Sequence, residues 1–461
     1  MRVERPARSD LARGDRAADG RRSRRIGVGP RVSPLRRMAK VVLAALLALA
    51  ALLGGMPGGQ AEVPPLKRGV NFELWQHWTN RETFLSPGYD TTDFPDWSRA
   101  VSDEKLAALH RQGFDFVRLN VDPSPFLWDE SRSDRLLESV AIAVRRLQKV
   151  GFAVVVDLHL VPDGPDRPEG LHYVLGTGGS RSTEGFERYL AIVRKFAARF
   201  EGFPAEATAL ELINEPDQDW FSPGPAGDRW PGQLARLYRA ARDEAPRLAL
   251  VLSGPRGGGL EGLLRVDPKP YVADDAVIWS FHIYDPGAIT HSGLPWEKTS
   301  VGHFLTGLPF PAARLDAPMR AKILARATAR LRAEIADPAK RAEIEAKLIP
   351  AIDAYVASTA GPETIERDVR RAADWAKRAG IPAGRILVGE FGVFQDEVEA
   401  ETRAAILRAT REAAEREGFA WAVYTAGLTR ARSSFGILDD TTTMRVDDRV
   451  SAALGLRRRG N

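Results

Sequence analysis

Short apolar runs recur along the chain from residue 67 onward, and between them lie longer segments in which apolar positions repeat every three or four residues. The short runs are typical of buried strands, and the longer repeat is typical of helices with one buried face. Eight runs are predicted to be strands: Gly69–Phe72, Asp115–Asn120, Phe152–Leu160, the run from Ala207, Leu248–Leu252, Ala276–Tyr284, Ile386–Val388 and Phe419–Thr425. This alternation predicts an α/β fold, a (β/α)8 TIM barrel, and a doubly wound open sheet is the alternative.

The segments between the strands are predicted to be amphipathic helices. Ser102 and Thr364 precede two of them and are good N-cap residues, because a hydroxyl can accept a hydrogen bond from an unpaired amide of the first turn. The predicted helices are Ser102–Gln112, Asp134–Val150, Thr183–Phe200, Gly232–Glu244, Thr364–Arg378, Glu397–Glu417 and Val446–Leu454.

One connection, about residues 285–362, is too long for an ordinary loop and is predicted to be a helical insertion after strand six. Its first part, Gly287–Pro311, is rich in Gly, Pro and aromatic residues. Its second part, Met319–Val356, is rich in Ala, Arg and Glu and is interrupted at Asp337-Pro338, which predicts a hairpin of two helices.

The amino terminus has the pattern of an export signal. Residues 1–37 form an Arg-rich leader, expected to be disordered or to lie upstream of the true start at Met38. In residues 38–61, predicted to be a signal peptide, Lys40 precedes the apolar run Val41–Leu53, which is shorter than the ~20 residues that a membrane span needs. A secreted or periplasmic protein without stable membrane association is therefore expected, with an uncleaved anchor as the alternative. Residues 62–461 are predicted to form a single catalytic domain.

The basic isoelectric point of about 9.4 comes from the leader. Residues 1–37 carry a net charge of +8 and Lys40 adds +1, so that removing both from the whole-chain +5 leaves about −4 for the remainder. This balance argues against a nucleic-acid partner. The chain has no cysteine, which excludes disulfides and thiol chemistry. Composition does not indicate the oligomeric state.

Two glutamates follow apolar runs in the same way. Asn214 and Glu215 come at the end of the run from Ala207, directly before Pro216, and Glu390 comes just after Ile386–Val388. Carboxyl ends of parallel strands meet at one edge of a barrel, where catalytic groups collect. Two carboxylates at one edge are what glycoside hydrolysis requires.

Polar residues at the expected strand ends resemble, in order, those of glycoside hydrolase family 5, the cellulase-type retaining glycosidases of clan A. The matching residues are Arg118, His159, Asn214, Glu215, His282, Tyr284 and Glu390. The resemblance implies that Glu215 is the acid/base and Glu390 the nucleophile of a double displacement. It also implies a polysaccharide or oligosaccharide substrate and no cofactor.

The other matching residues are expected to bind substrate or support the carboxylates. Arg118 and Tyr284 are expected beside Glu390, although an ion pair under the rim and core packing are alternatives. Asn214 is expected to donate to the sugar 2-hydroxyl. His159 and His282 bind hydroxyls or orient Glu215, or are satisfied core residues. A zinc site that joins Asp157 to both histidines is a further alternative, but no close metal-ligand spacing supports it, and no metal is expected.

The sequence departs from the family at strand eight, where the resemblance implies a Trp under the reacting sugar. Tyr424 stands there, and Trp421 is expected on the opposite face of the strand. Tyr424 is therefore predicted to be the sugar platform, and Trp296 is predicted to bind sugar from a loop. Aromatic rings can stack on the apolar faces of sugars, so tryptophans in or near the expected loops are candidates for substrate binding. Packing between loop and barrel is the alternative for these residues, which are Trp75, Trp78, Trp128, Trp220, Trp230 and Trp296.

The expected function is that of an exported retaining β-glycoside hydrolase acting on β-linked glucan, first of all an endo-β-1,4-glucanase. A β-mannanase or an exo-β-glucanase of the same family is the alternative. From another class, a catalytically weak carbohydrate-binding pseudoenzyme is kept as a hypothesis, because the expected Trp is missing at Tyr424.

Overall fold

The computed structural model describes residues 63–90, 101–165, 167–177, 183–217, 229–428 and 435–457, all of which belong to one compact unit. The expected leader and signal peptide, residues 1–61, lie outside this described part, as does Trp220. Within the described ranges, helices that combine the length and the apolar character needed to cross a bilayer are absent.

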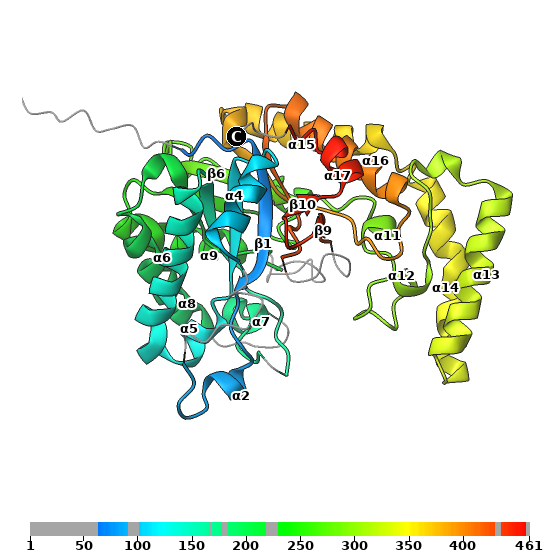
Figure 1. Ribbon diagram of the computed structural model, residues 1–461, viewed down its shortest axis with the longest axis horizontal. Coiled ribbons are helices and arrows are strands. Elements are labelled where there is room, and N and C mark those ends of the chain that lie inside the picture. Colours follow the sequence, from blue (N-terminus) through cyan, green and yellow to red (C-terminus); the bar gives the residue numbers. More distant parts are fainter. Residues whose placement is uncertain are drawn as a thin grey trace, which may run out of the picture. The chain divides into compact units, whose positions relative to one another are not determined.

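Eight parallel strands close into a barrel in chain order, which confirms the predicted fold (Figure 1). The open-sheet alternative is excluded because β1 pairs with both β2 and β8: Gly69 lies opposite Phe116 on one side and Ala422 on the other. The strands are β1 Arg68–Gln76, β2 Phe116–Val121, β3 Ala153–Leu158, β4 Thr208–Glu211, β5 Ala249–Ser253, β6 Val277–His282, β7 Ile386–Phe391 and β8 Ala420–Val423. A short antiparallel pair, β9 Leu438–Asp440 with β10 Arg445–Val446, was not predicted.

The long helices match the predicted segments to within a few residues. They are α4 Asp103–Arg111, α6 Ser133–Lys149, α8 Glu184–Phe200, α9 Arg229–Glu244, α15 Pro362–Arg378, α16 Ala400–Arg416 and the shorter α17 Asp448–Ala453. One-turn helices lie in the loops: α2 Arg81–Phe84, α5 Ser124–Trp128, α7 Leu171–Leu175, α10 Leu260–Leu263, α11 Gly287–Thr290 and α12 Val301–Phe304.

The two predicted N-caps had different outcomes. Ser102 caps α4, since its hydroxyl accepts from the Lys105 amide at 3.3 Å. Thr364 is not the N-cap of α15, and that prediction is wrong. The helix begins earlier, after Gly361, and Thr364 occupies its third position, where its hydroxyl accepts from the Gly361 amide at 3.0 Å. Pro362 can open the helix because the first turn needs no amide there.

The insertion is the predicted helical hairpin, formed by α13 Ala317–Glu334 and α14 Pro338–Ala357, which Figure 1 shows as an adjacent pair. Asp337 caps α14 through the Ala339 amide at 2.8 Å. The hairpin packs against α12 around a small core of its own, made of Phe304, Ala327, Leu331, Ile344 and Leu348. It is therefore a packed part of the fold that needs no ligand to hold it together.

The barrel interior is closed below the site by apolar side chains. Phe116 is fully buried there, and its ring lies over Gly69 on the neighbouring strand. A Cβ atom built on Gly69 would stand 2.3 Å from the Phe116 ring, so that only glycine fits this position. The floor of the barrel thus depends on a glycine in β1 facing an aromatic ring in β2.

Gly69→Ala is expected to destabilise the protein by about 1–3 kcal/mol, because the Phe116 ring is enclosed and cannot move away. Gly232→Ala is the matched control: Gly232 lies in α9 with open space around it, and alanine there should stabilise by about 0.5–1 kcal/mol. Thermal unfolding of both variants checks this, and an equal shift in the same direction would contradict the packing argument.

Candidate active site

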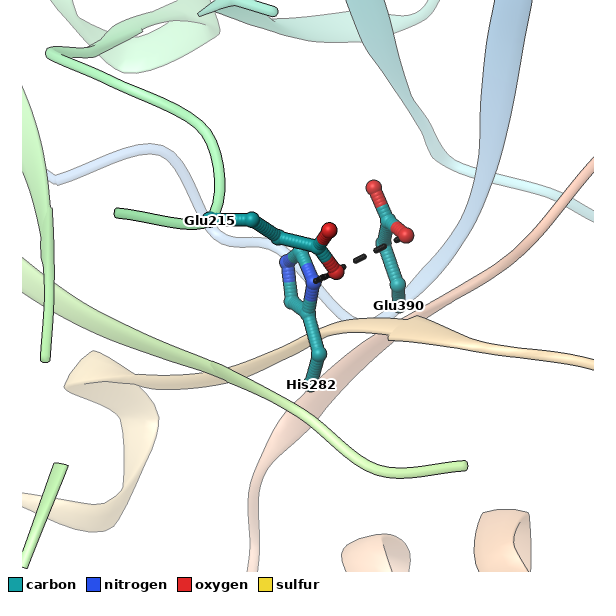
Figure 2. Close-up of side chains that lie close together, drawn as sticks. All are labelled: Glu215, His282 and Glu390. Atoms are coloured by element: carbon teal, nitrogen blue, oxygen red, sulfur yellow. Dashed lines mark hydrogen bonds and ion pairs between the residues drawn. The ribbon is translucent and has the colours of Figure 1, made fainter. Parts of the chain in front are cut away.

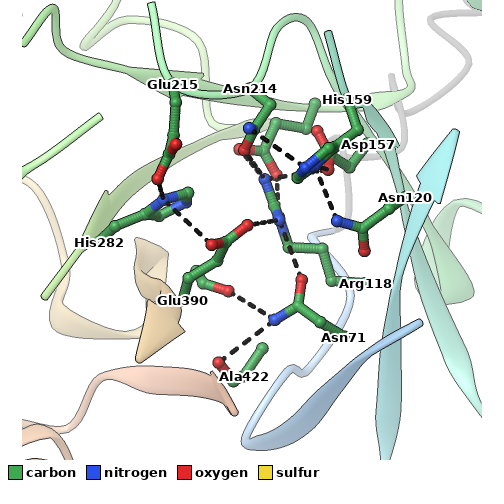
Figure 3. Close-up of polar contacts among 12 residues, drawn as sticks. Asn71, Arg118, Asn120, Asp157, His159, Asn214, Glu215, His282, Glu390 and Ala422 are labelled. Carbon is green, nitrogen blue, oxygen red and sulfur yellow. Dashed lines mark hydrogen bonds and ion pairs between the residues drawn. The ribbon is translucent and has the colours of Figure 1, made fainter. Parts of the chain in front are cut away.

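Arg118, His159, Asn214, Glu215, His282 and Glu390 gather at the carboxyl end of the barrel, although several lie beyond the strands rather than in them (Figure 3). Arg118 lies within β2 and His282 ends β6, but β4 ends at Glu211, so Asn214 and Glu215 belong to the loop that follows it. Tyr284 lies two residues past β6. The site is therefore built partly on loops, and the ends of the barrel strands hold these loops in place.

Glu215 and Glu390 face each other across His282 (Figure 2). His282 Nδ1 lies 2.7 Å from Glu215 Oε1 and 3.6 Å from Glu390 Oε2. One oxygen of each glutamate and one His282 nitrogen all lie within 4.8 Å of one another. Carboxylates from the loop after β4 and from β7, which β5 and β6 separate in the barrel, thus come close enough to act on one bond.

Glu390 is buried but is surrounded by groups that stabilise its ionised form. Arg118 Nη1 donates to Oε1 at 2.6 Å, and the Tyr284 hydroxyl donates to Oε2 at 2.8 Å. Burial by itself raises the pKa of a carboxyl, but the charges of His282, Arg118 and His159 and the Tyr284 hydrogen bond outweigh it. The pKa of Glu390 therefore lies below its ordinary value, and the side chain is an anion at neutral pH.

Arg118 is the centre of the polar network and has no exposed surface. Its Nε and Nη2 donate to both oxygens of Glu211, at 2.7 and 3.0 Å, and Nη2 also lies 3.1 Å from Asp157. Nη2 further donates to the Asn214 side-chain oxygen at 2.8 Å. That bond fixes the Asn214 amide, whose NH2 group lies 3.5 Å from His159 Nε2 and has a second hydrogen left to donate elsewhere.

His159 is held by polar partners of its own. Its Nδ1 lies 2.7 Å from Asp157 Oδ2 and 2.7 Å from the Asn120 side chain. With the Asn120 amide oriented so that its oxygen faces this nitrogen, the Asn120 NH2 group donates to the Phe72 and Arg118 carbonyls. Burial lowers the pKa of His159, but Asp157 outweighs it and the pKa lies above its ordinary value. His282 likewise has a raised pKa, because Glu390 and Glu215 outweigh its burial.

The backbone at Glu215 is unusual. Glu215 has φ +42°, a left-handed conformation that costs a non-glycine residue about 1 kcal/mol. Gly258 packs directly behind it, and a Cβ built there would lie 3.5 Å from the Glu215 Cα. The surrounding loops thus hold Glu215 in a backbone conformation that aims its carboxyl at His282.

Trp421 lies within β8, whereas Tyr424 is the first residue after it, because the strand ends at Val423 and not at Thr425 as predicted. The two side chains point to different sides of the barrel wall, as predicted. Trp421 is fully buried outside the barrel, where its ring packs edge-on against Phe391 at 5.8 Å and its Nε1 donates to Glu415 at 3.3 Å. The Tyr424 hydroxyl instead forms a hydrogen bond with Glu73, and its charge environment includes Glu390 and Glu215. Of the two rings, only Tyr424 is on the side of the site.

Sequence reasoning missed four polar residues of this network: Asn71, Glu73, Asp157 as a partner of Arg118, and Glu211. Each interrupts an apolar strand run, and that was the signal available. Asn71 accepts from Arg118 Nη1 at 2.9 Å and donates to the Gly389 carbonyl at 3.0 Å, which joins β1 to β7. Burial raises the pKa of Glu73 to about 7, and its charge neighbours include His159 and Glu390.

The indole of Trp296 is 66% exposed, and its ring meets Phe394 edge-on at 5.9 Å. Phe394 packs against Phe435, whose ring meets those of Tyr284 and Tyr424. Trp296 joins this aromatic cluster through Phe394, and its binding of sugar stays a prediction.

Two of the other tryptophans expected in loops belong to regular elements, Trp75 to β1 and Trp230 to α9. Both are buried, as is Trp78, so packing within the fold accounts for them.

A cavity of about 1200 Å³ opens beside the paired carboxylates. Glu215, His282 and Tyr284 form its end nearest the network, and residues of the loops after β3, β4, β5 and β6 form the rest. The cavity therefore extends on the Glu215 side of the site, and its size suits several sugar rings.

The zinc alternative does not correspond to the observed grouping. Asp157 and His159 pair with each other, whereas His282 lies with the two glutamates. Within the described ranges, Glu215, His282 and Glu390 are the set of possible ligands close enough to share an ion. His282 and Glu215 lie close together because they share a hydrogen bond, so their proximity needs no metal ion to explain it.

A closed (β/α)8 barrel with two facing carboxylates at the carboxyl edge defines a class of barrel glycoside hydrolases. The family comparison agrees with this class. The chain belongs to the cellulase family, glycosyl hydrolase family 5, whose family model matches residues 78–428.

Relatives in this family are distant. Endoglucanase 3 of Fibrobacter succinogenes is 24% identical over 378 residues, which cover 77% of this chain and 48% of that protein. Endoglucanase C of Acetivibrio thermocellus is 21% identical over 243 residues, 51% of this chain and 63% of that protein. The chain thus spans between about half and two thirds of the length of these two relatives.

Solved structures share the fold at lower identity. Cel5A of Thermotoga maritima aligns with a TM-score of 0.55 and 18% identity over 85% of this chain and 97% of that one. The cellulose synthase subunit Z of Clostridioides difficile aligns with a TM-score of 0.56 and 18% identity over 84% and 99% of the two chains.

Glu73→Gln is expected to make stability less dependent on pH. Folding raises the pKa of Glu73 from 4.5 to about 7, so the folded protein loses stability as pH rises between these values. The glutamine variant avoids that loss, which is at most about 3 kcal/mol, while still accepting a hydrogen bond from Tyr424. Thermal unfolding at pH 5 and pH 8 should show an advantage for the variant at pH 8 alone. The exposed Glu82→Gln is the control, and an equal advantage for Glu73→Gln at both pH values would contradict the prediction.

Proposed function

We propose that this protein is a retaining β-glycoside hydrolase that acts on β-linked glucan in the manner of an endo-β-1,4-glucanase. The observation that carries the proposal is that one carboxyl oxygen of Glu215 lies within 4.8 Å of one of Glu390, which supports a short separation of the two carboxyl groups. Retaining enzymes place their carboxyl groups about 5–5.5 Å apart, whereas inverting enzymes leave about 6.5–9.5 Å for a water molecule.

In this proposal Glu390 attacks the anomeric carbon and forms a glycosyl-enzyme. Its lowered pKa supports that role, because a nucleophile must be ionised before it attacks. Glu215 donates a proton to the departing oxygen and later takes one from water, and His282 holds its carboxyl in place at 2.7 Å. Asn214, whose oxygen is occupied by Arg118, donates its NH2 group to the 2-hydroxyl.

Substrate choice rests on the relatives. Both relatives described above are named endoglucanases, and Cel5A of Thermotoga maritima has been solved with cellobiose and with mannotriose. β-1,4-Glucan is therefore the first substrate, and β-mannan belongs in the same assay. Hydrolysis of mannan alone would make the protein a mannanase, and release of only one short product from the chain end would make it an exo-β-glucanase.

Export is part of the proposal. The apolar run Val41–Leu53 after Arg36, Arg37 and Lys40 supports a signal peptide in residues 38–61. Amino-terminal sequencing of the protein from the culture medium or periplasm tests this, and a mature chain that retains Val41–Leu53 would point to an uncleaved anchor.

Glu390→Gln is expected to reduce kcat on soluble β-glucan by at least about a thousandfold, because an amide cannot form the glycosyl-enzyme. The wild-type enzyme should release the β-anomer first, which NMR of the fresh product can detect. Circular dichroism confirms that the variant is folded, and Glu82→Gln serves as an exposed control. Retained turnover, or release of the α-anomer by the wild type, would contradict the proposed mechanism. No turnover by the wild type with intact oligosaccharide binding would favour the pseudoenzyme.

Tyr424→Ala is expected to weaken binding of cello-oligosaccharides about tenfold or more, since the ring that faces the reacting sugar is lost. Tyr424→Phe keeps the ring but removes the hydrogen bond to Glu73, so most of the affinity should remain. Calorimetric titration in the Glu390→Gln background checks both variants. Equal losses would assign the effect to the hydroxyl instead of the ring.

A further inference from the structure

The loop after β5 forms one wall of the cavity beside Glu215. Its backbone is tied to both catalytic loops: the Gly257 amide donates to the Pro216 carbonyl at 2.9 Å, and the His282 amide donates to the Gly258 carbonyl at 2.9 Å. The loop is therefore a fixed support for Glu215 and His282, and any side chain it carries has a fixed position relative to the acid/base.

Three successive residues of this loop have left-handed backbones. Arg256 has φ +61°, Gly257 φ +67° and Gly258 φ +65°. The two glycines adopt this conformation at no steric cost, whereas the arginine pays about 1 kcal/mol for it. Glycine would suit the backbone at position 256 better, so the fold itself does not account for an arginine there.

The Arg256 side chain lines the cavity and its donors are not used up by the protein. Its Nε is buried without a hydrogen-bond partner, and no carboxylate in the described part of the chain pairs with its guanidinium. Arg371 in the same cavity is different, because it bonds Glu261 at 2.6 Å and Asp368 at 3.4 Å. A buried unpaired donor costs free energy that a ligand can recover.

We propose that Arg256 is a specificity-determining residue of the leaving-group subsite, where its guanidinium donates to hydroxyls of the departing sugar. This inference rests on the proposed function: if Glu215 protonates the departing oxygen, the sugar beyond that oxygen lies on the Glu215 side, where the cavity is. A planar guanidinium with several donors suits adjacent hydroxyls of a pyranose better than a single ammonium does.

The test compares substrates that differ only in the leaving group. Wild type and Arg256→Met are assayed on cellotetraose and on an aryl β-cellobioside, whose phenolate leaves without a sugar in the cavity. The ratio of kcat/KM on cellotetraose to that on the aryl glycoside should fall at least about tenfold in the variant. Arg256→Lys should lie between the two proteins.

Arg256→Gly separates a binding role from a structural one. It removes the side chain and relieves the left-handed backbone, so the thermal midpoint should not fall while the same ratio of kcat/KM does. An unchanged ratio, or parallel losses on both substrates together with a lower thermal midpoint, would overturn the proposal.

A binding experiment tests the subsite without turnover. Cellotetraose is titrated calorimetrically into the Glu390→Gln variant and into the double variant that also carries Arg256→Met. Weaker binding in the double variant supports the subsite, and equal binding rejects it. Failure of the proposed function shows separately, as an inactive wild type on both the aryl glycoside and cellotetraose.

Discussion

The site depends on one buried cation, the Arg118 guanidinium. It has no contact with water and lies against Glu390, Glu211 and Asp157 at 2.6 to 3.1 Å. An unpaired charge in such a place would cost several kcal/mol, so the three carboxylates and the arginine require one another. Arg118 thereby links β2 to β3, β4 and β7 and keeps Glu390 ionised without exposing it to solvent.

The histidines complete the electrostatic balance. The carboxylates at this end of the barrel carry more negative charge than Arg118 alone can neutralise. This excess negative charge raises the pKa values of His159 and His282. Glu211 is also buried and keeps a raised pKa, because burial outweighs its bond to Arg118. The pKa of Glu390 instead lies below its ordinary value, because the positive charges of His282, Arg118 and His159 outweigh its burial.

The two sides of the paired carboxylates differ in character. On the Glu390 side, Tyr424 stands where the family resemblance implies a Trp, and its hydroxyl bonds Glu73, which adds ionisable groups to that wall. On the Glu215 side, the cavity is bounded mainly by loops, and the loop that carries Arg256 packs behind Glu215. The departure from the family pattern at Tyr424 therefore lies on the Glu390 side, away from this cavity.

The sequence by itself determined the barrel, the helical hairpin and the order of the polar residues that follow its strands. These are local properties: period, strand length and the polar residue after an apolar run do not depend on distant contacts. The tertiary structure alone decided that Glu73 meets Tyr424, that Arg118 joins three carboxylates and that Trp75 and Trp230 are buried. It also decided that Trp296 packs against Phe394 with most of its surface exposed. Those facts depend on which strands become neighbours when the barrel closes and on how loops fold over its rim. The pattern of residues within one segment does not show which strands become neighbours or how a loop folds.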